Sequence, residues 1–179
     1  MLKKILIALV VIVIVFVIIV ATRPSAFTIT RSALIVAPAE IVFAQVNDLH
    51  KWDAWSPWAK LDPTMKQTHE GAAVGVGAIY SWDGNKDVGA GRMTITESRT
   101  NEAIRIKLEF LKPFAAVNDI EFTFKPDGNQ TTVTWTMSGK NNFMAKAFCM
   151  FVNMDKMVGS DFEKGLASLK TIAEPAGKN

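Results

Sequence analysis

Tyr80 and Arg92 are the side chains that come nearest to chemistry, because each lies on a strand-like segment with mostly apolar neighbours. A phenol and a guanidinium could serve as the polar groups of an otherwise apolar pocket. Successive side chains of a strand point to opposite faces, so if Met93 and Ile95 point inward, Arg92 points outward and away from the pocket. Asp83, Glu97 and Asp119 are, like Arg92, ionisable residues on or beside predicted strands near the expected lumen. We expect outward, salt-bridging positions for this group, and no member of it requires an enzyme.

Metal and nucleophile chemistry have little support in the sequence. His50 and His69 are the only histidines, lie nineteen residues apart and belong to no ligand-spaced cluster. Neither has a neighbour that marks a catalytic base. Cys149 is the only cysteine, which excludes an intramolecular disulfide, and its apolar neighbours predict a buried structural thiol. We therefore expect no metal, no cofactor and no residue that is clearly catalytic.

The glycines between 71 and 91 also fail to make a nucleotide site. The stretch "GVGAIY" at 75–80 matches G-x-G-x-x-G only in part, because Tyr80 takes the place of the third glycine. A dinucleotide site needs this motif between a strand and a helix, whereas strands are predicted on both sides of it here. Bulges, tight turns and close approach to a helix explain these glycines better.

The tryptophan segment, residues 47–63 ("NDLHKWDAWSPWAKLDP"), has Trp52, Trp55 and Trp58 at three-residue intervals. A segment this polar cannot bury three indoles within itself, so they must cover something apolar elsewhere. In one interpretation they cap a barrel-like core. In the other, Trp55 and Trp58 form the rim of a cavity and offer rigid apolar faces to a ligand.

Methionines are concentrated late in the chain. Five of the eight lie between 137 and 157: Met137, Met144, Met150, Met154 and Met157. Ordinary core packing accounts for this bias, and a ligand cavity of loose specificity predicts the same enrichment.

The positive charge of the chain belongs to its N-terminus. The formal charge is +3, from 20 basic and 17 acidic residues. Lys3, Lys4 and Arg23 lie in the first 25 residues, where no acidic residue occurs, so the remainder carries 17 of each sign. A neutral domain without a basic block has no footprint for nucleic acid.

Residues 5–21 ("ILIALVVIVIVFVIIVA") contain no polar side chain. Seventeen helical residues rise about 25 Å, and Leu2 and Thr22 extend this toward the ~30 Å of the hydrocarbon layer. A cleaved signal peptide is the alternative, although the small-residue pattern after 19–21 is poor. We expect an anchor at 1–25 and a domain at 26–179. Lys3 and Lys4 favour a cytoplasmic N-terminus, with the domain periplasmic or otherwise extracytoplasmic.

Period-two and period-3.6 patterns divide the rest of the chain. Residues 27–36 predict a strand and 38–49 a short helix that leads into the tryptophan segment. Six further strands are predicted at 65–71, 75–82, 91–99, 102–110, 117–125 and 131–138. Residues 142–173 have helical spacing with a break near 153–155. This order predicts an α+β fold in which a curved antiparallel sheet of about seven strands wraps around a long C-terminal helix.

The order of elements, together with the tryptophan segment, "GNKDVGAGRMTI", "IKLEFLKPF", "VTWTMSGKNNFM" and "DFEKGLASLK", resembles the SRPBCC superfamily. This superfamily comprises the START, birch-pollen-allergen and polyketide cyclase/dehydrase-like proteins with the helix-grip fold. The likeness spans roughly 27–174. It implies a deep apolar cavity between sheet and helix that holds a lipid or another hydrophobic molecule. Because the superfamily mixes carriers, cyclases, hydrolases and chaperone activators, the resemblance predicts the fold better than the chemistry.

Candidate ligand-binding residues come from the tryptophan segment, the predicted strands and the C-terminal helical segment. They are Trp55, Trp58, Tyr80, Trp82, Arg92, Ile106, Leu108, Phe122, Trp135, Met137, Phe148 and Phe162. The leading hypothesis is a membrane-anchored carrier of a hydrophobic small molecule or lipid. A polyketide cyclase/dehydrase-like enzyme using Tyr80 and Arg92 is the second. A chaperone-linked interaction domain is the third, and it has no positive sign in the sequence.

Overall fold

The structure, a computed structural model, describes residues 1–176. The helices are α1 (Leu2–Thr22), α2 (Ala39–Val46), the 3₁₀ helix η1 (Leu49–Ala54), α3 (Phe143–Phe148) and α4 (Met154–Ala176). The strands are β1 (Ala26–Ile35), β2 (Lys66–Gly71), β3 (Ala78–Asp83), β4 (Ala90–Arg99), β5 (Ala103–Lys112), β6 (Ala116–Asp127) and β7 (Gln130–Lys140). The last residues of the predicted domain, 177–179, lie outside the described part, and its independence from the anchor stays a prediction.

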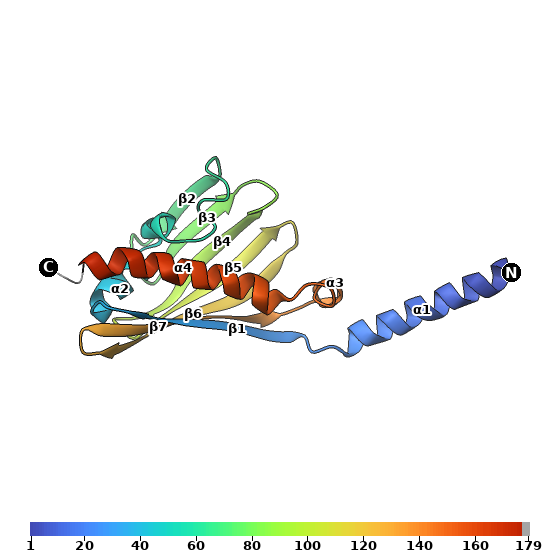
Figure 1. Cartoon of the computed structure of the whole chain (residues 1–179). Coiled ribbons are helices and arrows are strands. Elements are labelled where there is room, and N and C mark those ends of the chain that lie inside the picture. Colours follow the sequence, from blue (N-terminus) through green and yellow to red (C-terminus); the bar gives the residue numbers. More distant parts are fainter. Residues whose placement is uncertain (177–179) are drawn as a thin grey trace.

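The seven strands form one antiparallel sheet in the order β1-β7-β6-β5-β4-β3-β2. Consecutive strands from β2 to β7 are neighbours, and β1 closes the row by pairing with the last strand. Figure 1 shows α4 lying across the sheet and α1 projecting from one end of the body. The predicted helix-grip fold is therefore confirmed.

Alternating side chains give the sheet one apolar and one charged face. On β5, Ile104, Ile106 and Leu108 are buried, whereas Arg105 and Lys107 between them are exposed. Successive residues of a strand point to opposite faces, so this sequence can cover a core on one side only. The charges of the outer face pair across strands, as in the contact of 2.9 Å between Arg105 Nε and Glu121 Oε1.

The long helix α4 buries a stripe at helical spacing, Phe162, Leu166, Leu169 and Ala173, with no more than 1% of each side chain exposed. Burying a large apolar side chain contributes about 1.5–3 kcal/mol relative to leaving it in water. The stripe therefore supplies much of the attachment of α4 to the sheet.

An ion-pair cluster fixes the start of α4 over β1. Arg31 donates from Nε to Glu163 at 2.7 Å and from a terminal nitrogen to Asp155 at 3.0 Å. The guanidinium lies against Gly159, where a Cβ would overlap it. Its hydrogen bond and charge lower the pKa of the Asp155 carboxyl.

The C-terminal helical segment is broken at 149–153, slightly earlier than the break predicted near 153–155. Asn142 caps α3 by accepting a hydrogen bond from the backbone of Ala145 at 2.9 Å, and Asn153 accepts one from Lys156 at the start of α4. The break at 149–153 allows α3 to leave the direction of α4. Figure 1 shows α3 at the end of the body from which α1 projects.

Candidate ligand-binding site

We call the space between the sheet and α4 the grip. Its closed end is the half around Trp135 and Phe162, and aromatic rings line it. Trp135 on β7 stacks on Phe162 of α4, with ring centroids 4.1 Å apart and planes 7° from parallel. Phe122 on β6 lies 4.8 Å from the same indole, and Trp55 meets it edge-on at 5.7 Å. Because each ring has another ring beside it, this half is packed solid.

Two indoles of the closed end, Trp52 and Trp55, come from the tryptophan segment. Trp52 and Trp55 donate their ring N–H groups to the carbonyls of Val46 and Gln45, at 2.9 and 3.2 Å. These bonds remove the penalty of burying an indole N–H. Trp135 differs, since its Nε1 is buried and has no acceptor among the described residues.

The tryptophan segment continues as a bridge across one side of the grip. Pro57 lies against Gly165 of α4, and Trp58 contacts the ring of Phe162 at 6.3 Å. Further on, Asp62 accepts a hydrogen bond from the backbone of Asn85, in the β3–β4 turn, at 2.7 Å. The segment therefore links α4 to the far strands of the sheet.

Asp62 also holds its own turn in place. Its carboxylate accepts from the hydroxyl and the backbone N–H of Thr64, at 2.8 and 3.0 Å. The hydroxyl bond, followed by the backbone bond from Asn85, lowers the pKa of this buried carboxyl. A carboxylate with three donors stays ionised and keeps the bridge attached to the β3–β4 turn.

The other half of the grip, which we call the open end, is built from one register row across the sheet. Tyr80, Met93, Leu108 and Asn118 are successive partners on β3 to β6. Between 7% and 8% of each residue is exposed, whereas Phe122 and Trp135 at the closed end are at 0%. The inner face therefore becomes more accessible in one direction along the strands.

The open end faces α1. Asn118 pairs with Gly139 on β7, and Gly139 pairs with Phe27 near the beginning of β1, shortly after α1 ends. The next row outward contains Trp82 and Phe110, which are only partly buried and meet edge-on at 6.1 Å. Aromatic and aliphatic side chains thus line the inner face up to its edge.

Two polar groups interrupt this apolar surface. Burial, with a smaller contribution from the Asp53 carboxylate, raises the pKa of the Tyr80 hydroxyl to about 12. The hydroxyl is therefore a proton donor at neutral pH. Asn118 lies on the same face, beside Gly139, where a Cβ would overlap its Oδ1. A phenol and an amide in an apolar surface can orient a ligand that has one polar end.

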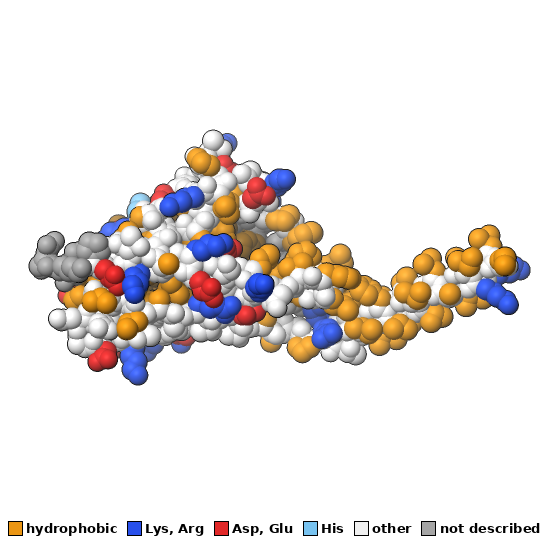
Figure 2. All heavy atoms as spheres, viewed as in Figure 1, with side chains coloured by type: hydrophobic (Ala, Val, Ile, Leu, Met, Phe, Trp, Pro, Cys, Tyr) orange, Lys and Arg blue, Asp and Glu red, His pale blue; other side chains and the backbone are white. Residues whose placement is uncertain are grey.

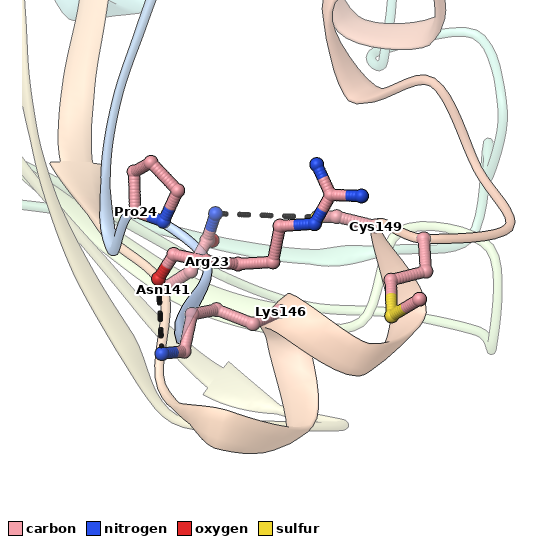
Figure 3. Close-up of a pocket in the computed structure, with 6 residues that line it drawn as sticks. Arg23, Pro24, Asn141, Lys146 and Cys149 are labelled. Atoms are coloured by element: carbon pink, nitrogen blue, oxygen red, sulfur yellow. Dashed lines mark hydrogen bonds between the residues drawn. The ribbon is translucent and has the colours of Figure 1, made fainter. Parts of the chain in front are cut away.

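Two hollows of the described surface lie outside the grip. One, of about 410 Å³, is lined by Arg23, Pro24, Asn141, Lys146, Cys149 and Met150 where α1 meets α3 (Figure 3). The other, of about 370 Å³, lies beside α2, where Glu40, Phe43 and Asn101 contribute to its lining. Beneath α4, where the resemblance implies a deep cavity, the rings of Trp55, Trp135 and Phe162 pack against one another.

Most of the candidate residues do face the interior. Those buried at the closed end or between the two ends are Trp55, Ile106, Phe122, Trp135, Met137 and Phe162. Those at the open end are Tyr80, Trp82 and Leu108. Trp58 is half-buried at the boundary, where it contacts Trp135 and Phe162. The structure thus brings these residues to one face of the sheet, and their contact with a ligand stays a prediction.

Two candidate residues lie elsewhere and do not face the interior. Arg92 is on the outer face, where a terminal guanidinium nitrogen lies 2.7 Å from Glu109 Oε2. Its strand parity, set by buried Met93, requires this position. Phe148 is 54% exposed on α3, because the break before α4 turns this short helix away from the core. Cys149 is half-buried, so its predicted burial is only partial.

Sequence reasoning missed two features. Asn118 is a polar residue at the inward parity shared with Ile120 and Phe122, and that parity could have identified it. His50 and His69, remote in sequence, stack with centroids 4.1 Å apart, and His69 also lies 5.1 Å from Tyr80. Among the described residues no group of three or more His, Cys, Asp or Glu side chains could hold a metal ion.

The family of this chain follows from a comparison with known families. Residues 26–174 match the model of the family described as polyketide cyclase / dehydrase and lipid transport, and the chain belongs to that family. The match covers the whole sheet and nearly all of α4 and leaves α1 outside. A search of curated proteins found no match.

Solved structures agree on the fold. Protein CV1439 from Chromobacterium violaceum is 15% identical, with a TM-score of 0.61 over 83% of this chain and 97% of its own. The Aha1 dimer structure from Colwellia psychrerythraea gives 18% identity and a TM-score of 0.60, covering 86% and 99%. The di-domain ARO/CYC StfQ of the steffimycin biosynthetic pathway gives 10% and 0.62, covering 85% of this chain and 52% of StfQ. At these identities the likeness concerns the fold alone.

Proposed function

We propose that this chain is a membrane-anchored domain that binds or carries a lipid or a similar hydrophobic molecule at the open end of the grip. The observation that carries the proposal is the partly buried pair Trp82 and Phe110 at the edge of the inner face, directly beyond the apolar row of Met93 and Leu108. Apolar surface left in contact with water costs about 25 cal/mol per Å². A ligand with an apolar body would remove that cost.

The polar groups of the row suggest how such a ligand would be oriented. Tyr80 and Asn118 lie at opposite ends of the row, with two apolar residues between them. An apolar chain across Met93 and Leu108 would let an oxygen at its end accept a hydrogen bond from the phenol or the amide. Sites of this kind combine a mainly apolar lining with a few polar groups that fix orientation.

Anchoring by α1 is consistent with a hydrophobic ligand. α1 is 21 residues long and apolar enough to cross a membrane, by length and composition. Lipids and lipid-like molecules partition into the bilayer, so an anchored domain would meet them where they are concentrated. The basic pair Lys3 and Lys4 favours a cytoplasmic N-terminus and an extracytoplasmic domain.

Photo-crosslinking in cells tests the binding proposal. Cells that express the full chain would be fed a photoactivatable, alkyne-bearing fatty acid, illuminated, and the crosslinked lipid on the purified chain measured. Leu108→Trp, which fills the open end, should reduce crosslinking strongly. Lys107→Trp makes the same replacement one residue earlier, on the exposed outer face, and should leave crosslinking unchanged.

Two results would count against this site. Equal labelling of the Leu108→Trp and Lys107→Trp chains is one, provided that both retain the near-ultraviolet circular dichroism of a packed domain. The other is a set of crosslinked peptides, mapped by mass spectrometry, that excludes β3 to β6.

A cyclase-type enzyme remains the second candidate, and the protonated hydroxyl of Tyr80 is the observation that favours it. A buried phenol with a raised pKa is a proton donor at neutral pH. Arg92, the other polar group considered for this reaction, faces away from the site. If the purified chain turns over an aromatic polyketide-like substrate and Tyr80→Phe abolishes turnover, the enzyme replaces the carrier.

A further inference from the structure

We propose that the end of the domain next to α1 is a second membrane contact, formed by α3 with its flank (143–151) and by the β5–β6 turn (111–117). The partner of this surface is the lipid bilayer in which α1 is embedded, so the inference rests on the anchoring proposed above. It adds an orientation, with the open end of the grip facing the bilayer.

The surface is apolar where a soluble domain would be polar. Phe148 and Phe151 are 54% and 79% exposed on and after α3, and Phe114 in the β5–β6 turn is 77% exposed. Other large apolar residues exposed in the same two segments are Leu111, Val117, Phe143 and Met144. Figure 2 shows hydrophobic side chains gathered on the end of the body from which α1 leaves, continuous with those of α1. Clusters of exposed apolar side chains mark interaction sites.

The contact between α3 and α1 determines how deep in the bilayer this surface lies. The rings of Phe16 and Phe151 stack with centroids 6.4 Å apart, and Val20, one turn after Phe16, is fully buried. Phe16 lies six residues before the end of α1, about 9 Å along the helix axis at 1.5 Å per residue.

The length of α1 requires Phe16 to be in the hydrocarbon layer. The full helix of 21 residues spans roughly 30 Å, which matches the layer. If the helix left the bilayer before Phe16, the remaining residues from Leu2 would span only about 21 Å, too short to cross. Phe151, stacked on Phe16, therefore reaches the apolar side of the interface.

Basic groups lie where lipid headgroups would be. Lys146 on α3 donates from Nζ to the carbonyls of Ala21 and Arg23, at 3.0 and 3.1 Å, and thereby caps the end of α1. Figure 3 shows the bond to Arg23. Arg23 and Lys146 also line the hollow between α1 and α3. At the end of a membrane helix, the charged groups of lysine and arginine favour the level of the lipid phosphates, and their apolar stems lie in the interface.

The same orientation gives a lipid a short route into the domain. The partners Phe110 and Ala116 lie at the base of the β5–β6 turn, directly beyond the row that contains Leu108 and Asn118. If the turn rests on the bilayer, a lipid could move from the outer leaflet to the inner face of the sheet without crossing water.

Depth measurements on the full chain test the proposal. In a Cys149→Ser background, an environment-sensitive fluorophore would be attached to Phe114→Cys, Phe148→Cys, Val76→Cys or Ile12→Cys, and each chain reconstituted in phosphatidylcholine nanodiscs. Val76 is the matched control, since it is 57% exposed but lies by the β2–β3 turn, at the opposite end of the strands. Ile12 lies in the middle of α1 and reports on anchoring itself.

We expect blue-shifted emission, and quenching by lipids with a spin label high on the acyl chain, at positions 114 and 148 but not at 76. Position 12 should be quenched by labels placed deep in the chain. If the fluorophores at 114 and 148 emit as they do in water while the one at 12 is quenched, the second membrane contact is wrong and the anchor stands. An aqueous spectrum at position 12 would instead remove the anchor, and with it this inference.

Discussion

The two ends of the grip share one sheet and differ in what fills them. At the closed end, rings from β6, β7 and α4 stack on one another, and Phe122, Trp135 and Phe162 are exposed by no more than 1%. At the open end, Tyr80 and Leu108 on the same face remain slightly accessible, and Trp82 and Phe110 are only half-covered. The strands are continuous between the two, so the difference comes from what packs on their inner face, which at the closed end includes Phe162 of α4 and Trp55 of the tryptophan segment.

This difference teaches that stability and binding are separated along the strands. Close-packed rings gain dispersion energy and leave no room for a guest. An apolar face that is not fully packed contributes less to folding and retains surface that a ligand can cover. Variants at the closed end should therefore alter the free energy of unfolding, and variants at the open end should alter affinity.

Trp135→Ala should have the largest effect. It removes the ring that stacks on Phe162 and leaves a cavity, so we expect the free energy of unfolding to fall by about 3–5 kcal/mol. Urea midpoints of the full chain in detergent measure this. Ligand affinity of the fraction that stays folded should not change.

Trp135→Phe is the control for this variant. It keeps an aromatic ring against Phe162 and removes an indole N–H that has no acceptor among the described residues. Removal of an unpaired buried donor offsets part of the lost packing, so the midpoint should fall much less than for alanine. If the two variants are equally unstable, the stacked ring is not what holds the closed end together.

Trp58→Ala should have an intermediate effect on both properties, because this half-buried ring belongs to both regions. The ring meets Trp135 and Phe162 edge-on, and the residue belongs to the tryptophan segment that bridges the grip. We expect losses of about 1–3 kcal/mol in unfolding free energy, with a measurable loss of ligand affinity. Urea titration and ligand titration on the same variant separate the two. A large fall in midpoint with unchanged affinity would assign Trp58 to packing alone.

The fold was predictable because its signals are local. Alternation at Ile104, Ile106 and Leu108 gives the strand and its inner face, and the spacing of Phe162 and Leu166 gives the face of α4. Each pattern depends only on residues a few positions apart. The short loops between successive strands then leave few ways to order the sheet.

The interior and the site were less predictable, because they depend on contacts between distant residues. Nothing local indicates that Trp52 and Phe122 meet, or that His50 stacks on His69. Phe148 continues the helical spacing of the core residues, and only the break after it turns the ring outward. Arg92 is different, since its parity already indicated the outer face.

Tyr80 provides a spectroscopic comparison between the ends, because it is the only tyrosine and reports on the open end alone. Burial raises its pKa to about 12, whereas an exposed tyrosine ionises near pH ~10. Tyrosinate absorbance of the folded chain should therefore rise near pH 12. The raised pKa contributes stability that is complete below pH ~10 and is lost as the pH rises through the folded value.

Tyr80→Phe should remove this part of the alkaline loss of stability. A bound ligand that covers the phenol should move the absorbance midpoint further upward. An absorbance midpoint near pH ~10 in the folded chain would mean that the Tyr80 hydroxyl is as exposed to solvent as one on the surface. The partial burial on which the proposed site depends would then be incorrect.

Arg92→Ala should have the smallest effect, although the residue is charged and lies next to the site in sequence. Its side chain is half-exposed and pairs with Glu109 on the outer face, where such pairs contribute about 0–1 kcal/mol. Lys107 also contacts Glu109, at 3.0 Å, so the carboxylate keeps a partner. We expect a free energy of unfolding, from urea titration, within about 1 kcal/mol of that of the parent chain, and an unchanged ligand affinity. The neighbouring Met93→Ala, on the inner face, is the comparison variant and should weaken binding. Loss of affinity in Arg92→Ala equal to that in Met93→Ala would mean that the ligand contacts the outer face of the sheet, and the assignment of binding to the inner face would fail.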